Sequence, residues 1–293
     1  MYKALSPGAV NCKPANLKDA IDLARGHGFG GVELSPREVI NVDAEHGAGT
    51  AKRWFDAAGL VPAGFGLPVD WRGEEAKWRE GLDTLPELAR AAAGLGCRRC
   101  MTWVMPSSDE RDYDVNRRFH VERFAPAARI LGEHGIALGL EFIGPKTLRD
   151  ARKYPFIYTM GDMLELGREI GPNVGLLLDV WHWYTSGATV AQLRALRPEQ
   201  VVYVHVSDAP AGIPVDEQID NRRALPGETG VIDIAAFLRS LDAIGYDGPI
   251  TAEPFKAELK ELPSDDARLD VVSKALDVIF QKAGLTPHTP GVR

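Results

Sequence analysis

The chain of 293 residues lacks the long apolar runs of membrane proteins, the many cysteines of disulfide-bonded proteins and the excess of basic residues of nucleic-acid-binding proteins. No apolar run approaches the ~20 residues that span a bilayer, and the N-terminal residues show no apolar signal core with a cleavage site. Lys and Arg number 34 against 41 Asp and Glu, a net charge of −7 that disfavours a nucleic-acid partner. We therefore expect a cytoplasmic protein with a small-molecule partner. The sequence leaves a homo-oligomer open.

Cysteine is scarce too, and three cysteines give no disulfide framework. Cys97-Arg-Arg-Cys100 has the spacing of a thioredoxin-like redox pair, which usually opens a helix. Here the stretch CRRCMTWVM has the pattern of a strand, so alternate residues face opposite sides of a sheet. We interpret both cysteines as ordinary structural residues.

What the sequence does contain is one repeated rhythm: a short β-rich apolar run, a turn, then helical periodicity. Glycine often marks the helix ends, as in Ala58-Gly59 and Ile244-Gly245. The predicted strands are Lys3–Val10, Gly31–Leu34, Leu60–Phe65, Arg99–Val104, Ala137–Phe142, Val174–Asp179, Val201–Val206 and Ile250–Glu253. The predicted helices are 16–27, 46–58, 74–94, 115–134, 160–170, 189–196, 232–244 and 266–282.

Eight strand–helix units in this length predict an α/β fold in which the parallel sheet closes into a (β/α)₈ TIM barrel, a single domain over residues 1–293. A doubly wound open sheet is the alternative, but no Gly-rich nucleotide fingerprint follows the first strand. Two connections, 144–159 and 207–230, are longer than a mere connector needs. Both follow strand carboxyl ends, where barrel active sites lie, so we expect them to build or cover the site.

Four of the later strands run into a polar residue after apolar ones: Glu141, Asp179, His205 and Glu253. Each alone could be a salt-bridged structural group. Together they point toward one barrel axis, because neighbouring strands lie only ~4.8 Å apart. Three clustered carboxylates repel one another without a cation. With one imidazole they form a ligand set for one divalent metal ion, Mn²⁺ or else Mg²⁺, Co²⁺ or Zn²⁺.

These residues also carry a family resemblance that covers the whole predicted barrel. The segments Gly-Leu-Glu141-Phe, Leu-Asp179-Val-Trp-His182, Val-His205-Val-Ser-Asp208, Arg223-Ala-Leu-Pro-Gly-Glu and Glu253-Pro-Phe resemble the xylose isomerase-like TIM barrels. That group includes sugar isomerases, ketose 3-epimerases, inosose dehydratases and apurinic endonucleases. Within it, the order of these motifs is most similar to the 2-keto-myo-inositol isomerases.

The resemblance implies a metal-dependent isomerase or epimerase that acts on a small keto-sugar or keto-cyclitol through an enediolate. It makes the four strand-end residues the metal ligands, with Glu141 and Glu253 also transferring protons. It assigns His182 to catalysis and a substrate oxygen, and Arg223 to substrate binding. Arg222 leaves the register of that arginine open by one position.

Other residues are candidates for substrate contact, each with a structural alternative. Asp208 could orient His205, bind substrate or start a turn. Trp103 and Trp181 could form an apolar wall for a sugar ring or simply pack in the barrel. Glu33 ends the second strand, and Lys146 lies in the fifth loop, where a solvated lysine is equally expected.

Two other activities use the same fold. An inosose or keto-sugar dehydratase (a lyase) needs only a leaving group beside the acid that protonates the enediolate. An apurinic endonuclease would need further histidines for a three-metal cluster. The third and fourth strands end in Gly-Phe-Gly-Leu-Pro and Trp-Val-Met-Pro, which hold none, and the acidic charge also disfavours DNA.

Overall fold

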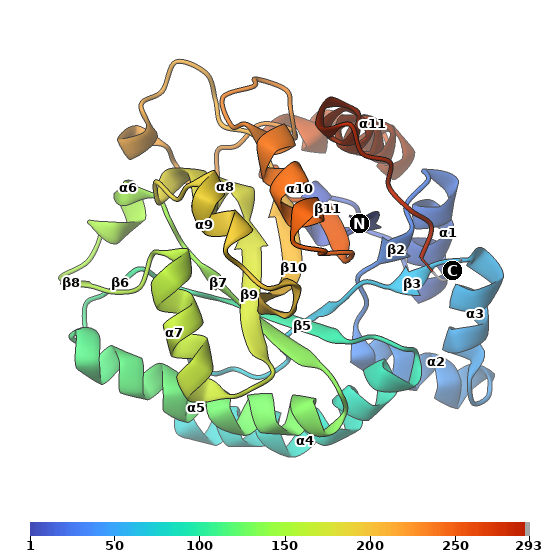
Figure 1. Cartoon of the computed structure of the whole chain (residues 1–293). Coiled ribbons are helices and arrows are strands. Elements are labelled where there is room, and N and C mark those ends of the chain that lie inside the picture. Colours follow the sequence, from blue (N-terminus) through green and yellow to red (C-terminus); the bar gives the residue numbers. More distant parts are fainter. Residues whose placement is uncertain (291–293) are drawn as a thin grey trace.

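The computed structural model describes residues 1–290, and a parallel β-sheet forms its centre (Figure 1). The strand order in this sheet is β3-β2-β1-β11-β10-β9-β7-β5-β4, with every neighbouring pair parallel. The strands of this sheet are β1 (Tyr2–Leu5), β2 (Gly31–Val32), β3 (Val61–Pro62), β4 (Phe65–Gly66), β5 (Arg99–Val104), β7 (Ala137–Phe142), β9 (Val174–Asp179), β10 (Val201–Val206) and β11 (Pro249–Ala252).

The two ends of this sheet are parts of the same chain segment, so the sheet closes on itself. β3 pairs with β2, and β4, which begins three residues after β3 ends, pairs with β5. Between β3 and β4 the chain stays paired with the segment of β2, because Ala63 N–H donates to Val32 O and Leu34 N–H donates to Gly64 O. β3 and β4 are therefore two parts of one barrel strand that is interrupted at Ala63-Gly64. The nine strands thus form the eight strands of a barrel, and the predicted TIM barrel is confirmed.

The helices lie around the strands, as Figure 1 shows. All eight predicted helices are present, several with N-caps such as Asn16, Thr159 and Ser264 whose side chains accept a hydrogen bond from the first turn. The helices are α1 (Leu17–Gly26), α2 (Pro36–His46), α3 (Thr50–Ala58), α4 (Glu75–Gly94), α5 (Tyr113–Glu133), α6 (Lys146–Arg149), α7 (Met160–Ile170), α8 (Val180–Thr185), α9 (Val190–Arg194), α10 (Ile234–Ala243) and α11 (Asp265–Ala283).

The structure adds three helices that the sequence pattern did not predict. α2 begins at Pro36 directly after Ser35, a start signal that the short second strand obscured. α8 begins immediately after β9, with Asp179 as its N-cap. α6 lies in the long loop after β7, and that loop also contributes β8 (Tyr154–Pro155), which pairs antiparallel with β6 (Ser107–Ser108).

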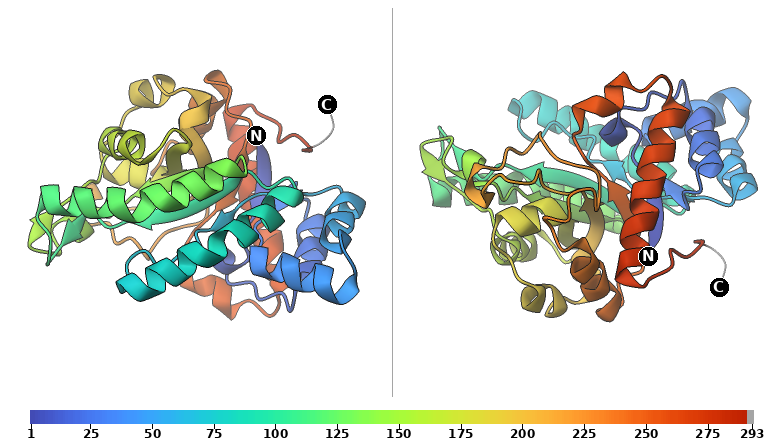
Figure 2. Two further views of the ribbon diagram at one scale, coloured as in Figure 1. Left: turned by 90° about the horizontal axis from the view of Figure 1, so that it is seen from below. Right: turned by 90° about the horizontal axis from the view of Figure 1, so that it is seen from above.

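The two ends of the described chain are tied together on one side of the barrel. Both views of Figure 2 place α11 beside the N-terminal strand β1. Lys3 on β1 donates hydrogen bonds from Nζ to Ser273 Oγ (3.0 Å) and Asp277 Oδ1 (2.6 Å) on α11. These contacts place α11, the last helix, against the first strand and help to close the ring of helices.

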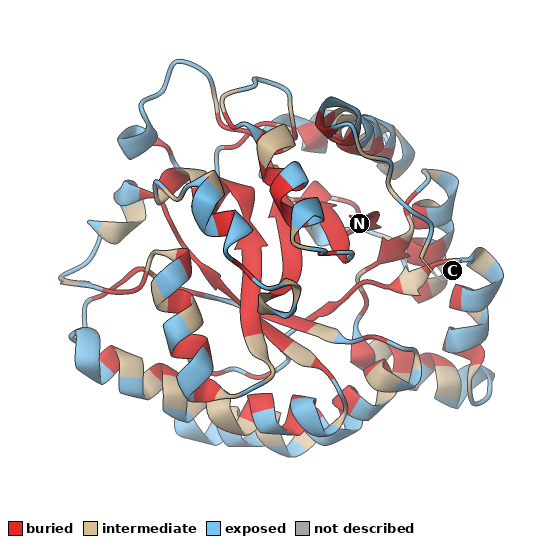
Figure 3. Cartoon of the chain, in the orientation of Figure 1, coloured by how far each residue is buried: buried red, intermediate tan, exposed pale blue. Residues whose placement is uncertain are grey.

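Burial follows the barrel architecture, as Figure 3 shows. The strands are almost entirely buried, and the helices alternate between buried and exposed turns. Cys97 and Cys100 are both buried free thiols, in agreement with the structural interpretation. Among the described residues 1–290, no helix has both the length and the apolar character needed to cross a membrane.

Candidate functional site

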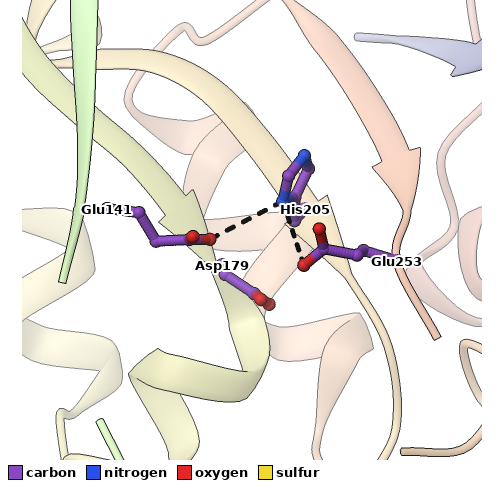
Figure 4. A group of neighbouring side chains, drawn as sticks. All are labelled: Glu141, Asp179, His205 and Glu253. Carbon is purple, nitrogen blue, oxygen red and sulfur yellow. Dashed lines mark ion pairs between the residues drawn. The ribbon is translucent and has the colours of Figure 1, made fainter. Parts of the chain in front are cut away.

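The four predicted ligand residues converge at the carboxyl ends of adjacent strands (Figure 4). Glu141 lies near the end of β7, Asp179 ends β9, His205 lies in β10, and Glu253 directly follows β11. His205 is in register with Asp179 on the neighbouring strand. One ligand atom from each of the four residues lies within 4.8 Å of the others. Parallel strands thus bring together residues that are up to 112 positions apart in the sequence (253 − 141).

The contacts within this cluster suit a cation better than they suit hydrogen bonds. His205 Nδ1 lies 3.6 Å from Glu141 Oε1 and 3.4 Å from Glu253 Oε2. Glu141 Oε1 and His205 Nδ1 are buried and make no hydrogen bond within the protein. Buried polar atoms nearly always have a partner, so two unpartnered ligand atoms facing each other mark a place for one. The residues fit one divalent metal ion held by oxygen and nitrogen ligands.

The pKa values of the cluster show how strongly the residues interact. Burial, reinforced by the charges of Glu253 and Asp179, raises the pKa of Glu141 to about 8. Burial alone would lower the pKa of His205, but the nearby Glu253 and Glu141 carboxylates overcome it and raise that pKa well above its usual range. The cluster therefore takes up protons when no other cation balances its carboxylates.

Arg223 enters this cluster from the long loop after β10. Its Nη1 donates to Asp179 Oδ2 at 2.6 Å and to Glu253 Oε2 at 3.3 Å. Its Nη2 donates to Asp220 Oδ1 at 2.9 Å, and its Nε to the Asp220 backbone oxygen at 2.8 Å. The Arg223 side chain is almost completely buried, whereas the neighbouring Arg222 is exposed. Of the two arginines, Arg223 is therefore the one that lies in the cluster.

His182 lies on α8, where its ring is held by the backbone. Gly144 N–H donates to His182 Nδ1 at 3.1 Å, so Nδ1 is the acceptor and the ring proton belongs on Nε2. A side chain on Gly144 is excluded, because its Cβ would lie 2.5 Å from the His182 carbonyl oxygen. Nε2 lies 3.8 Å from Asp179 Oδ2 and 3.7 Å from Asp220 Oδ1. Burial lowers the pKa of His182, which favours the neutral ring.

A cavity of about 280 Å³ opens above these residues. Its polar side chains lie among apolar ones, the usual composition of a small-molecule site. Both long loops contribute to the wall, Leu148 from the loop after β7 and Asp220 from the loop after β10, as expected from their positions. The lining residues are Trp103, Met105, Glu141, Ile143, Leu148, His182, Asp220, Arg223, Glu253 and Phe255.

Two polar or aromatic lining residues were missed by the sequence reasoning. Asp220 is one of several acidic residues in its loop, and nothing in the sequence distinguishes it from Asp216 or Glu217. Phe255 has a backbone φ of 40°, a conformation that non-glycine residues rarely adopt. It follows Glu253-Pro254, and its aromatic character so close to a predicted ligand was the one available signal.

Two predicted contact residues instead fasten the loops. Lys146 forms an ion pair with Asp216 at 3.1 Å and is about half exposed, so it links the two long loops to each other. Asp208 is fully buried, and both of its carboxylate oxygens are taken by the backbone. It accepts hydrogen bonds from the N–H groups of Ala209, Thr229, Gly230 and Ile232. Neither Lys146 nor Asp208 is among the residues that line the cavity.

The remaining candidates divide between the cavity wall and the layer beneath it. Trp103 lines the cavity and is 41% exposed. Trp181 is fully buried, with the Arg223 guanidinium 5.1 Å from its ring centre, so it supports the arginine and cannot form a substrate wall. Glu33 accepts hydrogen bonds from Ser6 Oγ (2.7 Å) and Tyr203 Oη (2.9 Å), and the Tyr203 ring contacts the ring of His205.

Comparison with known proteins agrees with this geometry. The family model of the xylose isomerase-like TIM barrels matches residues 21–280. The chain belongs to this family. A solved xylose isomerase domain protein from Alicyclobacillus acidocaldarius is 34% identical, with a TM-score of 0.83 and coverage of 96% of this chain and 99% of that one. An IolI protein solved with a bound zinc atom has a TM-score of 0.76 at 19% identity, over 96% and 99% of the two chains.

Curated relatives in the family catalyse several related reactions. The inosose isomerase of Bacillus velezensis is 20% identical over 88% of this chain and 90% of its own length. The L-ribulose 3-epimerase of Mesorhizobium japonicum is 24% identical over 84% of this chain and 77% of its own. The 3-dehydroshikimate dehydratase of Pseudomonas putida is 29% identical over 56% of this chain, which matches only 26% of that enzyme. The relatives that this chain resembles thus include an isomerase, an epimerase and a dehydratase.

Proposed function

We propose that this protein is a divalent-metal-dependent isomerase or epimerase of a small, uncharged keto-cyclitol or keto-sugar, inosose-like in structure. The observation that carries the proposal is the convergence of three carboxylates and one imidazole beside a cavity of about 280 Å³. The inosose isomerase and L-ribulose 3-epimerase relatives support the reaction class.

Glu141, Asp179, His205 and Glu253 would hold the metal ion, with Mn²⁺ the first candidate. When bound, such an ion supplies Lewis-acid polarisation of a substrate carbonyl and its adjacent hydroxyl. The unpartnered Glu141 Oε1 and His205 Nδ1 are the atoms that supply free ligand capacity. Asp179 is preorganised for its role, because Trp181 N–H donates to its Oδ1 and Arg223 to its Oδ2.

Proton transfer is assigned to the two glutamates that line the cavity. Glu141 and Glu253 come from β7 and β11, with β9 and β10 between them, so they approach a substrate from different sides. One carboxylate removes the proton from the carbon next to the carbonyl, and the other returns a proton to the neighbouring carbon or to the opposite face. The first outcome is an isomerisation and the second an epimerisation.

Charge in the cavity favours an uncharged substrate. Glu141, Glu253 and Asp220 give the lining three carboxylates, and Arg223 is the lining residue that carries a permanent positive charge. That guanidinium is already bonded to Asp179, Glu253 and Asp220. A phosphate or carboxylate on the substrate would meet repulsion here with no unpaired cation among the lining residues to receive it. Arg223 and the Nε2 proton of His182 instead suit hydroxyl and carbonyl oxygens.

A dehydratase is the second candidate, supported by the 3-dehydroshikimate dehydratase relative. The same residues would form the enediolate, and an acid would then protonate a hydroxyl on the next carbon so that it leaves as water. The products distinguish the two reactions, because a dehydratase yields an unsaturated ketone that absorbs in the ultraviolet.

The test is to incubate the Mn²⁺-loaded protein in D₂O with keto-inositols and ketoses and to follow deuterium incorporation by NMR. In Glu253→Gln we expect turnover to fall by about two or more powers of ten, as for lost general base catalysis, with the fold intact by circular dichroism. Glu258→Gln, an exposed glutamate close by in the chain, is the matched control and should behave as the wild type. Near-normal turnover in Glu253→Gln, or no reaction with any substrate in the wild type, would refute the proposal.

A further inference from the structure

A stack of three side chains lies at the rim of the cavity, outside the metal cluster. The guanidinium carbon of Arg72 lies 3.5 Å from the ring centre of Trp103 and 4.0 Å from that of Trp71. Among the described residues, aromatic rings with centres as far apart as 6.4 Å are in contact, but Trp71 and Trp103 make no ring contact with each other, so they lie on different sides of the guanidinium. The guanidinium is therefore sandwiched between the two indoles, an arrangement available to arginine and not to lysine.

The stack is anchored in the core at its inner end. Trp71 is buried, packs on Phe124 with ring centres 4.6 Å apart, and donates from Nε1 to Thr102 Oγ1 at 3.1 Å. Arg72 is fixed at its other side, because its Nη2 donates to the backbone oxygen of Trp103 at 2.8 Å. The chain of contacts thus runs from the core through Arg72 to an indole at the cavity wall.

The position of Arg72 decides which face of Trp103 is free. Trp103 lines the cavity and is 41% exposed, although Arg72 covers one face of its ring. The uncovered face is then the one that is available to a ligand. Arg72 contacts the two indoles and the Trp103 backbone oxygen, and the carboxylate whose charge acts on it is that of Asp70.

Phe255 provides a second wall of the same kind. It lines the cavity, is also 41% exposed, and has the guanidinium of Arg223 4.7 Å from its ring centre. The cavity therefore has two aromatic walls, each with a guanidinium against it. Rigid aromatic faces contact the C–H face of a closed ring over a larger area than they contact a flexible open chain, which must also lose rotational freedom on binding.

We propose that Arg72 is a positioning residue that holds Trp103 as a platform for the C–H face of a ring, so that the enzyme selects closed-ring substrates over open-chain ketoses. The inference rests on the proposed function and adds the substrate class to it. Arg72 acts through Trp103 and needs no contact with substrate. It follows that its planar shape matters, and that its charge alone does not suffice.

The experiment compares Arg72→Met and Arg72→Lys with the wild type. Arg72→Met fills similar space without a planar cation, and Arg72→Lys keeps the charge but loses the planar group. Arg111→Met is the matched control, because Arg111 also stacks on an aromatic ring, 3.9 Å from the centre of Phe119, but that ring, unlike Trp103, does not line the cavity. KM and kcat are measured with a keto-inositol and with L-erythrulose as the open-chain probe, a ketotetrose too short to close into a furanose ring.

Both Arg72 variants should raise KM for the keto-inositol roughly three- to thirty-fold, the range of a lost cation–π contact, with kcat within about two-fold. KM for L-erythrulose should stay within about two-fold. A wild-type KM in Arg72→Lys would mean that the charge is recognised and would overturn the proposal. So would an equal rise of KM for both probes, or no rise for either.

A second readout separates this inference from the proposed function. The emission of Trp103 is obtained for each protein as the difference between that protein and the same protein carrying Trp103→Phe. This emission should shift to the red in Arg72→Met, because the indole loses its cover, and should not shift in Arg111→Met. The non-reacting ring myo-inositol should quench that emission in the wild type and bind three- to thirty-fold more weakly in both Arg72 variants. If no keto-substrate reacts but these changes appear, the proposed reaction fails and the platform stands. If the emission and myo-inositol binding are unchanged, the platform fails whatever the reaction.

Discussion

The two halves of the barrel differ in what their strands carry. In the later half, β7, β9 and β10 each have six residues, and together with β11 they present all four proposed ligand residues at their carboxyl ends. In the earlier half, β2, β3 and β4 have two residues each. That half contributes Glu33 beneath the site and, on β5, the exposed indole of Trp103 with the Arg72 stack behind it.

This difference teaches how the fold divides recognition from chemistry. Long strands that are paired on both sides hold charged groups rigidly, which a ligand cluster requires. The earlier half supplies a wall, and small displacements of a wall alter affinity more than they alter the reacting geometry. Substitutions in the later half should therefore reduce turnover, whereas those in the earlier half should affect substrate affinity or stability.

The largest effect is expected from Asp179→Asn in the later half. Asp179 is completely buried in the centre of the cluster. The asparagine oxygen can still accept from Trp181 N–H, so the fold should persist while the site loses a ligand charge. We expect bound metal, measured by elemental analysis, to fall well below one ion per chain and turnover to fall roughly 10²–10³-fold.

Asp83→Asn is the matched control, an exposed aspartate on α4 of the earlier half, and it should change neither quantity. Full metal occupancy in Asp179→Asn would contradict both the ligand assignment and the division between the halves.

An intermediate effect is expected from Arg223→Ala. The guanidinium touches two ligands and Asp220, and its Nη2 lies 3.4 Å from His182 Nε2. Its loss should raise KM and lower kcat/KM by about 1.5–3 kcal/mol, the range for a charged hydrogen bond. Metal should stay bound, because removing a positive charge beside Asp179 and Glu253 makes the cluster more attractive to a cation.

The exposed neighbour offers the control, since Arg222→Ala should retain wild-type kinetics. Loss of metal in Arg223→Ala would show instead that the arginine is needed to preorganise Asp179.

The convergence of the four proposed metal ligands could be predicted from the sequence because their position depends on the regular part of the fold. Parallel strands bring their carboxyl ends to one side, so a polar residue after an apolar run is enough to place Glu141, Asp179 and Glu253. The same reasoning places His205. Eight strand–helix units likewise predict the number of barrel strands, although the third barrel strand is interrupted at Ala63-Gly64.

The wall of the site could not be predicted, because it depends on how loops pack. Nothing in the sequence indicates that the Asp208 carboxylate would accept its hydrogen bonds from backbone N–H groups, or that Asp220 would face the cavity. The roles of the tryptophans depend on one helix start: α8 begins directly after Asp179, which turns Trp181 inward and leaves the wall to Trp103. Arg72 lies in an irregular loop, so its stacking partners follow from tertiary contacts alone.

The smallest effect concerns stability in the earlier half and involves His120 on α5. His120 is 4% exposed, and its ring stacks on Phe156 with centres 5.0 Å apart and lies 5.2 Å from the ring centre of Trp71, the base of the Arg72 stack. Burial lowers the pKa of His120 to about 4, although its Nδ1 hydrogen bond with the Asn116 backbone oxygen opposes the shift. The neutral ring is therefore the form that the folded protein accepts.

The consequence is a loss of stability in mild acid. The unfolded chain binds a proton at His120 below its ordinary pKa of 6.5, whereas the folded chain does so only near 4. The contribution of the neutral ring is thus fully present above pH 6.5 and is lost as the pH falls from 6.5 to 4. Between pH 7 and pH 5 the wild-type free energy of unfolding should drop by about 1–2 kcal/mol more than that of His120→Phe, measured by urea denaturation.

His46→Gln, at an exposed histidine, should keep the wild-type slope, and kcat at pH 7 should be unchanged in His120→Phe because α5 carries no ligand of the cluster. If the free energy of unfolding had the same pH dependence in His120→Phe and in the wild type, the neutral His120 ring would not be a source of acid sensitivity, and the prediction would be wrong.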